Sequence, residues 1–159
     1  MAHGTLVLGL GNALLADDGI GLHVISALKR VVAERRSSTP VFIRDGGTLG
    51  LSLLPEIDAA TALIVVDAAN FGGAPGDVKV FDSEAMDVQV GGAKSSAHEL
   101  ALADLLCAAR LNGSLPRRRA LVGIAPSSVE WGLEPTPEVA ACIPLACAKI
   151  QAIIERWAT

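Results

Sequence analysis

The sequence has few cysteines and few charged residues, and these shortages exclude several classes of protein. Its three cysteines form no Cys-x-x-Cys pair, which argues against a secreted disulfide framework and predicts reduced thiols in a cytoplasmic protein. Charged residues make up 19% of the chain and the formal net charge is -4. A protein with this charge balance is not expected to bind nucleic acid or an anionic membrane through broad electrostatic attraction.

Targeting and membrane signals are also missing. No Lys or Arg precedes Lys29, so the basic region of a signal peptide is absent. The apolar stretch over residues 139–148 contains Pro144 and stops at Lys149, short of the roughly 20 residues that a membrane-spanning helix requires. We therefore expect a soluble, cytoplasmic protein with no membrane partner.

Apolar residues are abundant, at 51% of the 159 residues, so the chain can bury a core. No internal repeat or low-complexity linker divides it. Because about 100–200 residues is the usual size of one domain, we expect residues 1–159 to form a single domain.

Short apolar runs alternate with segments of helical periodicity along the chain. The runs predict strands over residues 5–10, 41–43, 63–66 and 120–124, with a weaker edge strand over 78–81. Helices are predicted from residue 20, over 49–57, over 98–111 and from residue 137, where Pro144 should kink or restart the last one. This pattern predicts an α/β fold: a three-layer α/β/α sandwich with a mostly parallel twisted sheet of about five strands, in which one edge strand could run antiparallel.

In such sheets, ligands bind beyond the carboxyl ends of the strands. The first strand leads into Gly9-Leu10-Gly11-Asn12, but Leu14 stands where a dinucleotide-binding fingerprint needs its third glycine. The glycines could therefore serve only a tight turn. The acids that follow, Asp17 and Asp18, could cap the next helix or belong to a site.

Two further candidates lie near predicted strand ends. Asp67 directly follows the most apolar strand, so its carboxylate needs a partner, a cap or a metal. His98-Glu99 does not begin a zinc-protease helix because Leu102 replaces the second histidine, and His98 alone could be a surface residue. If Asp18, Asp67 and His98 meet at one sheet edge, they form a three-ligand set with open positions, suited to zinc, nickel, manganese or iron.

Six blocks of the sequence occur together in one known family. They are residues 9–21 with Gly9-Leu10-Gly11-Asn12, then Asp45-Gly46-Gly47-Thr48 with Gly50, Val66-Asp67-Ala68 leading to Gly76, His98 through Gly113, Val122 through Gly132 with Ser128-Val129-Glu130, and Thr136-Pro137 with Val139. In this order they resemble the [NiFe]-hydrogenase maturation endopeptidases, and the resemblance covers almost the whole chain.

The resemblance implies a cytosolic peptidase that removes a C-terminal extension from the hydrogenase large-subunit precursor after nickel insertion. By position, the metal-contacting residues of the family fall on Asp18, Asp67 and His98, although Glu is common where Asp18 stands. The substrate-binding segment falls on Asp45-Gly46-Gly47-Thr48. No chemical role follows for Ser128-Val129-Glu130.

The nickel is expected to arrive with the precursor, so that docking occurs only on a nickel-loaded substrate. One histidine and two hard carboxylates predict no firmly bound resident metal. Two alternatives stay open: a metal-dependent maturation chaperone that binds without cutting, and a peptidyl-tRNA hydrolase, which shares the Gly-Leu-Gly-Asn opening but not Asp17-Asp18. Residues 117–119, three arginines, are predicted to form a solvated loop that could touch an acidic partner. Neither the oligomeric state nor the particular hydrogenase follows from the sequence.

Overall fold

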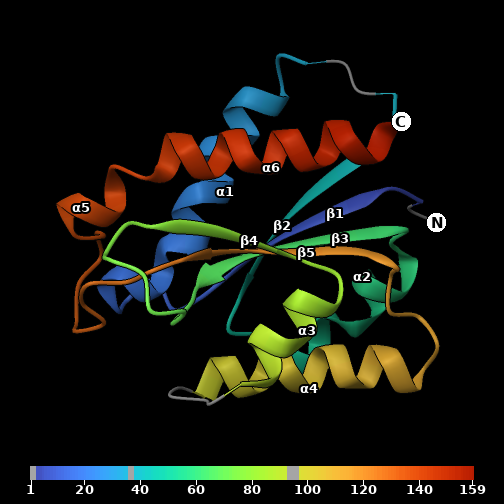
Figure 1. The fold of residues 1–159 in the computed structure, drawn as a ribbon, viewed down its shortest axis with the longest axis horizontal. Coiled ribbons are helices and arrows are strands. Elements are labelled where there is room, and N and C mark those ends of the chain that lie inside the picture. Colours follow the sequence, from blue (N-terminus) through green and yellow to red (C-terminus); the bar gives the residue numbers. More distant parts are fainter. Residues whose placement is uncertain (1–2, 36–37, 93–96) are drawn as a thin grey trace.

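The computed structural model describes residues 3–35, 38–92 and 97–159, without the side chains of residues 97–100. A five-stranded sheet forms the middle layer, and helices cover both of its faces (Figure 1). The predicted fold class, a three-layer α/β/α sandwich, is confirmed.

The sheet is parallel except at one edge. Its strands are β1 (Thr5–Leu10), β2 (Val41–Gly47), β3 (Ala62–Ala68), β4 (Val78–Asp82) and β5 (Arg118–Ile124), in the order β2-β1-β3-β5-β4. Only β4 runs antiparallel to its neighbour, β5. Every residue of the central strands β1 and β3 is buried, which explains why these strands are continuous apolar runs in the sequence.

Each face of the sheet has its own apolar core. On one face, α1 (Ile20–Val32) and α6 (Ile143–Ala158) pack over residues such as Val7, Ile64 and Val122 (Figure 1). On the other face, α2 (Leu54–Ala59), α3 (Glu84–Gly91) and α4 (Ala97–Leu111) pack over Leu8 and Val65. Three short helices lie in connections: η1 (Ala16–Gly19), η2 (Gly50–Leu53) and α5 (Pro137–Ala140).

Four of the described strands, β2 to β5, are longer than predicted, and the extensions of β2 and β5 change how two segments are interpreted. Gly46 and Gly47 lie inside β2, where a bulge shifts the pairing from Gly9 with Asp45 to Leu10 with Gly47. The fifth strand begins at Arg118, so only part of the arginine run lies in a loop. The interpretation of residues 117–119 as a solvated loop therefore holds for Arg117 and is wrong for Arg118 and Arg119, which belong to β5.

Helix α3 was not predicted, because its apolar residues are not concentrated on one face and glycines follow it directly. A partly buried ion pair fixes it to the sheet: Arg119 Nη2 of β5 lies 2.6 Å from Asp87 Oδ2 of α3. The hydrogen bonds from Arg119 lower the pKa of the Asp87 carboxyl, against the opposing effect of burial. This pair also uses the arginine that local sequence analysis had assigned to solvent.

The C-terminal helical segment restarts near Pro144 as predicted, because α5 ends at Ala140 and α6 begins at Ile143. Together, Pro137–Ala158 spans 22 residues and is long and apolar enough to cross a membrane, so the argument from residues 139–148 alone was too narrow. In the fold, however, α6 packs against α1 and buries Cys147 and Ile150 in the core. Helix α6 therefore belongs to the layer that covers this face of the sheet.

Candidate functional site

The carboxyl end of β1 leads into a turn that fixes Asp18. Gly11 has φ +128°, and a Cβ atom at this position would lie 1.9 Å from the carbonyl oxygen of Asp18. Only glycine therefore allows η1 to fold back this closely against the turn. The Asp18 side chain is 7% exposed, and its Oδ2 accepts a hydrogen bond of 2.9 Å from the N–H of Asn12.

Asp67 lies on the adjacent central strand. It is the penultimate residue of β3, paired with Gly123 of β5, so it lies inside the strand and not directly after it as predicted. Its exposed fraction is 3%. Because β1 and β3 are parallel neighbours and η1 packs against β3, Asp18 and Asp67 belong to the same edge of the sheet.

His98 does not follow the carboxyl end of a parallel strand, because antiparallel β4 and then α3 precede it. Because β4 is antiparallel, it ends beside the start of β5, away from the carboxyl ends of the parallel strands. There the N–H of Ser83 donates a hydrogen bond to the carbonyl of Arg119. Helix α3 then returns to the site edge, where Gln89 Nε2 donates a 2.9 Å hydrogen bond to the carbonyl of Asn70, just beyond β3. His98 lies in the first turn of the next helix, α4, and its side chain lies outside the described part of the structure.

The proposed ligand set of Asp18, Asp67 and His98 therefore stays a prediction. Among the side chains that the structure describes, no three His, Cys, Asp or Glu residues are placed to hold a metal ion. The imidazole that would complete the set is not one of those side chains.

Sequence analysis missed the role of Asp17, whose side chain is fully buried. Asp17 Oδ2 accepts hydrogen bonds of 2.9 Å from the N–H groups of both Ser127 and Ser128, and Oδ1 accepts one of 2.6 Å from the N–H of Thr136. The hydroxyl of Thr136 donates to the same carboxylate. Burial raises the pKa of Asp17, but the hydrogen bonds from Ser128, Thr136 and Ser127 outweigh it and hold the pKa below its usual value.

These bonds fasten the loop of residues 125–136 beside the candidate site. Backbone bonds add to them: Asp17 N–H donates to the Ser128 carbonyl, and Ala16 and Gly132 join the two segments further along. Thr136 precedes the helix as predicted, but its hydroxyl binds Asp17 and does not cap the helix. The Ser128-Val129-Glu130 block thus has a structural role, in which the Ser128 backbone binds Asp17.

The predicted substrate-binding segment, residues 45–48 at the end of β2, lies next to the Gly11 turn. Asp45 is exposed, whereas Gly46 is buried so tightly that a Cβ would lie 2.8 Å from the Leu8 and Leu10 side chains. The carbonyl of Gly47 accepts a 3.0 Å hydrogen bond from the N–H of Gly11. Residues 45–48 are therefore directly linked to the turn that packs against Asp18.

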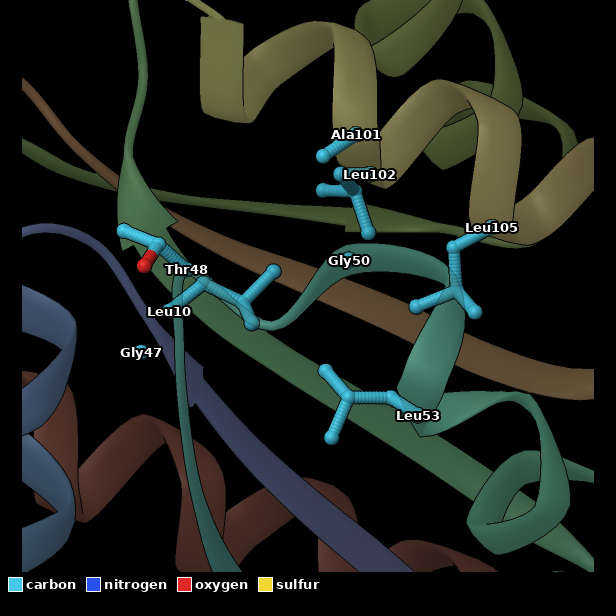
Figure 2. Close-up of a pocket in the computed structure, with 8 residues that line it drawn as sticks. All are labelled: Leu10, Gly47, Thr48, Gly50, Leu53, Ala101, Leu102 and Leu105. Carbon is cyan, nitrogen blue, oxygen red and sulfur yellow. The ribbon is translucent and has the colours of Figure 1, made fainter.

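Beside this segment lies a small apolar hollow (Figure 2). Gly47 and Thr48 form its rim, and Leu53 of η2 and the α4 side chains Leu102 and Leu105 line its interior. Its cavity volume is about 10 Å³, enough for about one water molecule. The hollow can seat the tip of an apolar side chain only if its walls move.

Comparison with known proteins identifies the family. The family model for hydrogenase maturation proteases matches residues 22–153. The chain belongs to the hydrogenase maturation protease family. It is 37% identical to the hydrogenase 2 maturation protease of Escherichia coli K12 over 152 residues, which cover 94% of this chain and 89% of that protein. It is 36% identical to the hydrogenase expression/formation protein HupD of Rhodobacter capsulatus over 153 residues, 96% of this chain and 71% of that one.

Solved structures of the family share the fold. The hydrogenase maturating endopeptidase HybD of Escherichia coli superposes with a TM-score of 0.86 at 36% identity, over 96% of this chain and 93% of that chain. The [NiFe] hydrogenase maturation protease HybD of Thermococcus kodakarensis gives a TM-score of 0.78 at 25% identity, over 95% and 99%. These matches confirm the predicted enzyme class, a hydrogenase maturation endopeptidase, and decide against a peptidyl-tRNA hydrolase. Such proteases act on hydrogenase large-subunit precursors.

Proposed function

We propose that this protein removes the C-terminal extension of a [NiFe]-hydrogenase large-subunit precursor after nickel insertion, and that it recognises the nickel bound to that precursor. The observation that carries the proposal is the burial of two carboxylates, Asp18 and Asp67, at one sheet edge of a maturation protease. Carboxylate oxygens and a histidine nitrogen are donors that bind divalent transition-metal ions. A nickel ion delivered by the substrate would gain such donors at this edge, and docking would depend on it.

In the proposed complex, nickel held by the thiolates of the precursor gains Asp18, Asp67 and His98 as further ligands. Segment 45–48 contacts the substrate beside them. Hydrolysis adds the oxygen of water to the carbonyl carbon of the scissile bond, breaks the C–N bond and passes a proton to the leaving amine. The bound metal could polarise that carbonyl or activate the water, and both roles suit a site with open coordination positions.

We further propose that the enzyme acts in the cytoplasm without a tightly held metal of its own. A catalytic zinc site has three protein ligands and a bound water, and partner groups orient its histidines. The proposed set has one histidine and two carboxylates, which are hard ligands that bind many cations. Weak retention of a resident ion is expected from that donor set.

The decisive experiment uses chelator-treated, buffer-exchanged protein. We expect it to shorten nickel-loaded precursor, seen as a mass loss at the precursor's C-terminus, and to leave nickel-free precursor intact. Stoichiometric zinc, with activity lost on chelation and restored by zinc on nickel-free precursor, would make it an ordinary metallopeptidase. Binding without any mass loss would support the maturation chaperone instead.

Substitutions test the ligand set in the same assay. We expect Asp67→Asn and His98→Ala each to abolish processing while the thermal midpoint stays nearly unchanged, because asparagine keeps the size of the buried Asp67 side chain and His98 lies in the first turn of α4. Asp82→Asn, which alters an exposed ion pair with Arg156, is the matched control and should process normally. Full processing by either site variant would remove that residue from the proposed set.

A further inference from the structure

The loop that Asp17 fastens exposes an unusual amount of apolar surface. The exposed fractions are 55% for Val129, 82% for Trp131 and 68% for Leu133, all within five residues. Single exposed apolar residues are ordinary on protein surfaces, but large apolar groups gathered on one loop indicate an interaction surface. We call residues 129–134 the Trp131 rim.

The Trp131 rim is held in place by its backbone. Gly132 N–H donates a 2.9 Å hydrogen bond to the carbonyl of Leu14, and the carbonyl of Gly132 accepts one of 2.8 Å from Ala16. Leu14 is itself exposed and extends the apolar surface toward the site. Together with the bonds to Asp17, these contacts order the loop before any partner binds, which lowers the entropic cost of docking.

The charges around the Trp131 rim indicate what kind of partner it fits. Glu130 and Glu134 alternate with the apolar residues along the rim, and both are exposed. The segments that follow the four parallel strands, residues 11–19, 48–49, 69–77 and 125–136, contain no Lys or Arg. They contain five acids, of which Asp77, Glu130 and Glu134 are exposed, whereas Asp17 and Asp18 are buried. A complementary partner therefore presents apolar side chains together with positive charge.

We propose that the Trp131 rim is the docking surface for the stretch of the precursor next to its scissile bond, with the exposed apolar side chains of the rim and its two glutamates making the contact. The rim is continuous with the candidate site, because Asp17, which anchors the loop, immediately precedes Asp18. The identity of the partner rests on the proposed function. Trp131 is the expected anchor, since exposed tryptophans that become buried contribute most to protein interfaces.

Steady-state kinetics on nickel-loaded precursor test this surface. We expect Trp131→Ala to lower kcat/KM by at least about tenfold and Leu133→Ala by less, mainly through KM, because the rim contacts residues beside the scissile bond and not the bond itself. Leu111→Ala is the matched control: Leu111 is 86% exposed, at the end of α4 distant from the site edge, and its variant should behave as wild type. Equal kcat/KM for Trp131→Ala and Leu111→Ala would overturn the proposal.

Salt dependence tests the acidic part of the rim. For the wild type, kcat/KM should fall as ionic strength rises, because opposite charges steer the encounter. The variant with both Glu130→Gln and Glu134→Gln should show a weaker dependence. Glu34→Gln, at an exposed position after α1, should keep the full dependence. Identical salt profiles for all three proteins would remove the charge component of the proposal.

A binding measurement separates this proposal from the proposed function. The chain has two tryptophans, so labelling with 5-fluorotryptophan gives two fluorine resonances, assigned with Trp131→Phe. Adding a cleavage-blocked, nickel-loaded precursor should shift the Trp131 resonance and leave that of Trp157 unchanged. If the wild type cuts precursor but neither the resonance nor the kinetics responds at Trp131, the docking proposal fails and the function stands. If the wild type cuts nothing, the function fails, and an unmoved Trp131 resonance would overturn docking as well.

Discussion

Replacing Asp17 by asparagine tests whether the buried carboxylate holds the site loop in place. The change keeps the size of the side chain and removes its charge. It also replaces one acceptor oxygen by an amide nitrogen, which can only donate. If the remaining oxygen keeps its bonds to Ser127 and Ser128, the amide nitrogen faces the N–H of Thr136, which now lies 2.6 Å from the carboxylate. Two donors then face each other in a buried position.

The magnitude follows from those bonds. Hydrogen bonds to a charged group contribute about 1.5–3 kcal/mol each, and a buried donor left without an acceptor costs about 1–3 kcal/mol. The amide keeps two bonds in weaker form and loses the one to Thr136, so we expect Asp17→Asn to lower the free energy of unfolding by about 3 kcal/mol. For a chain of this length, that corresponds to a fall of about 6–12 °C in Tm. Asp82→Asn, which affects only an exposed ion pair, should cost less than about 1 kcal/mol.

Urea unfolding at several pH values is the appropriate assay. The folded pKa of Asp17 lies below its unfolded value, so its contribution to stability is present above about pH 3.9 and is lost as the pH falls through the folded pKa. The gap in unfolding free energy between wild type and Asp17→Asn should therefore be full at pH 7 and narrow in acid below pH 3.9. A variant as stable as the wild type at pH 7, or a gap that does not change with pH, would refute the role given to this carboxylate.

Two further substitutions test the turn that carries Asp18. Gly11→Ala should lower the free energy of unfolding by about 3 kcal/mol or more and abolish processing, because the new Cβ collides with the Asp18 carbonyl. Gly72 also has a positive φ, of +79°, but has open space around it. Gly72→Ala should therefore lower the free energy of unfolding, measured by thermal unfolding, by only about 1–2 kcal/mol. Equal losses for the two glycines would contradict the packing argument. Asp18→Glu should keep substantial processing activity in the mass assay, since glutamate keeps the carboxylate and lengthens the side chain by only one methylene. Complete loss would show that the site is adapted to the shorter side chain.

The layers and the sheet could be predicted because their signals are local. Strands buried on both faces must be apolar throughout, and the run from Leu63 to Val66 is therefore unmistakable in the sequence. The restart of the last helix at Pro144 follows from the missing N–H of proline. Asp18 and Asp67 could also be placed at one sheet edge, because parallel strands end on the same side.

What could not be predicted depends on contacts between distant segments. The bonds from Asp17 reach residues 110 to 119 positions away, and no local pattern records them. Helix α3 has almost no amphipathic pattern and is fixed instead by the pair between Asp87 and Arg119. Asp45-Gly46-Gly47 has the residues of a turn, but within β2 Gly46 avoids a collision with Leu8 and Leu10 of the neighbouring strand β1, and a bulge absorbs the extra residue.

Asp17 and Asp18 are adjacent in the sequence but have different roles in the structure. In a 3-10 helix, neighbouring side chains point about 120° apart, so adjacent acids on η1 cannot share one task. Asp17 turns into the loop of residues 125–136 and binds its backbone, while Asp18 stays at the carboxyl end of β1. If both acids only capped the following helix, neither the bonds of Asp17 to the loop nor the bond of Asp18 to Asn12 would be explained. Loss of Asp17 should therefore reduce stability and loosen the docking surface, whereas loss of Asp18 should act on the proposed nickel contact itself.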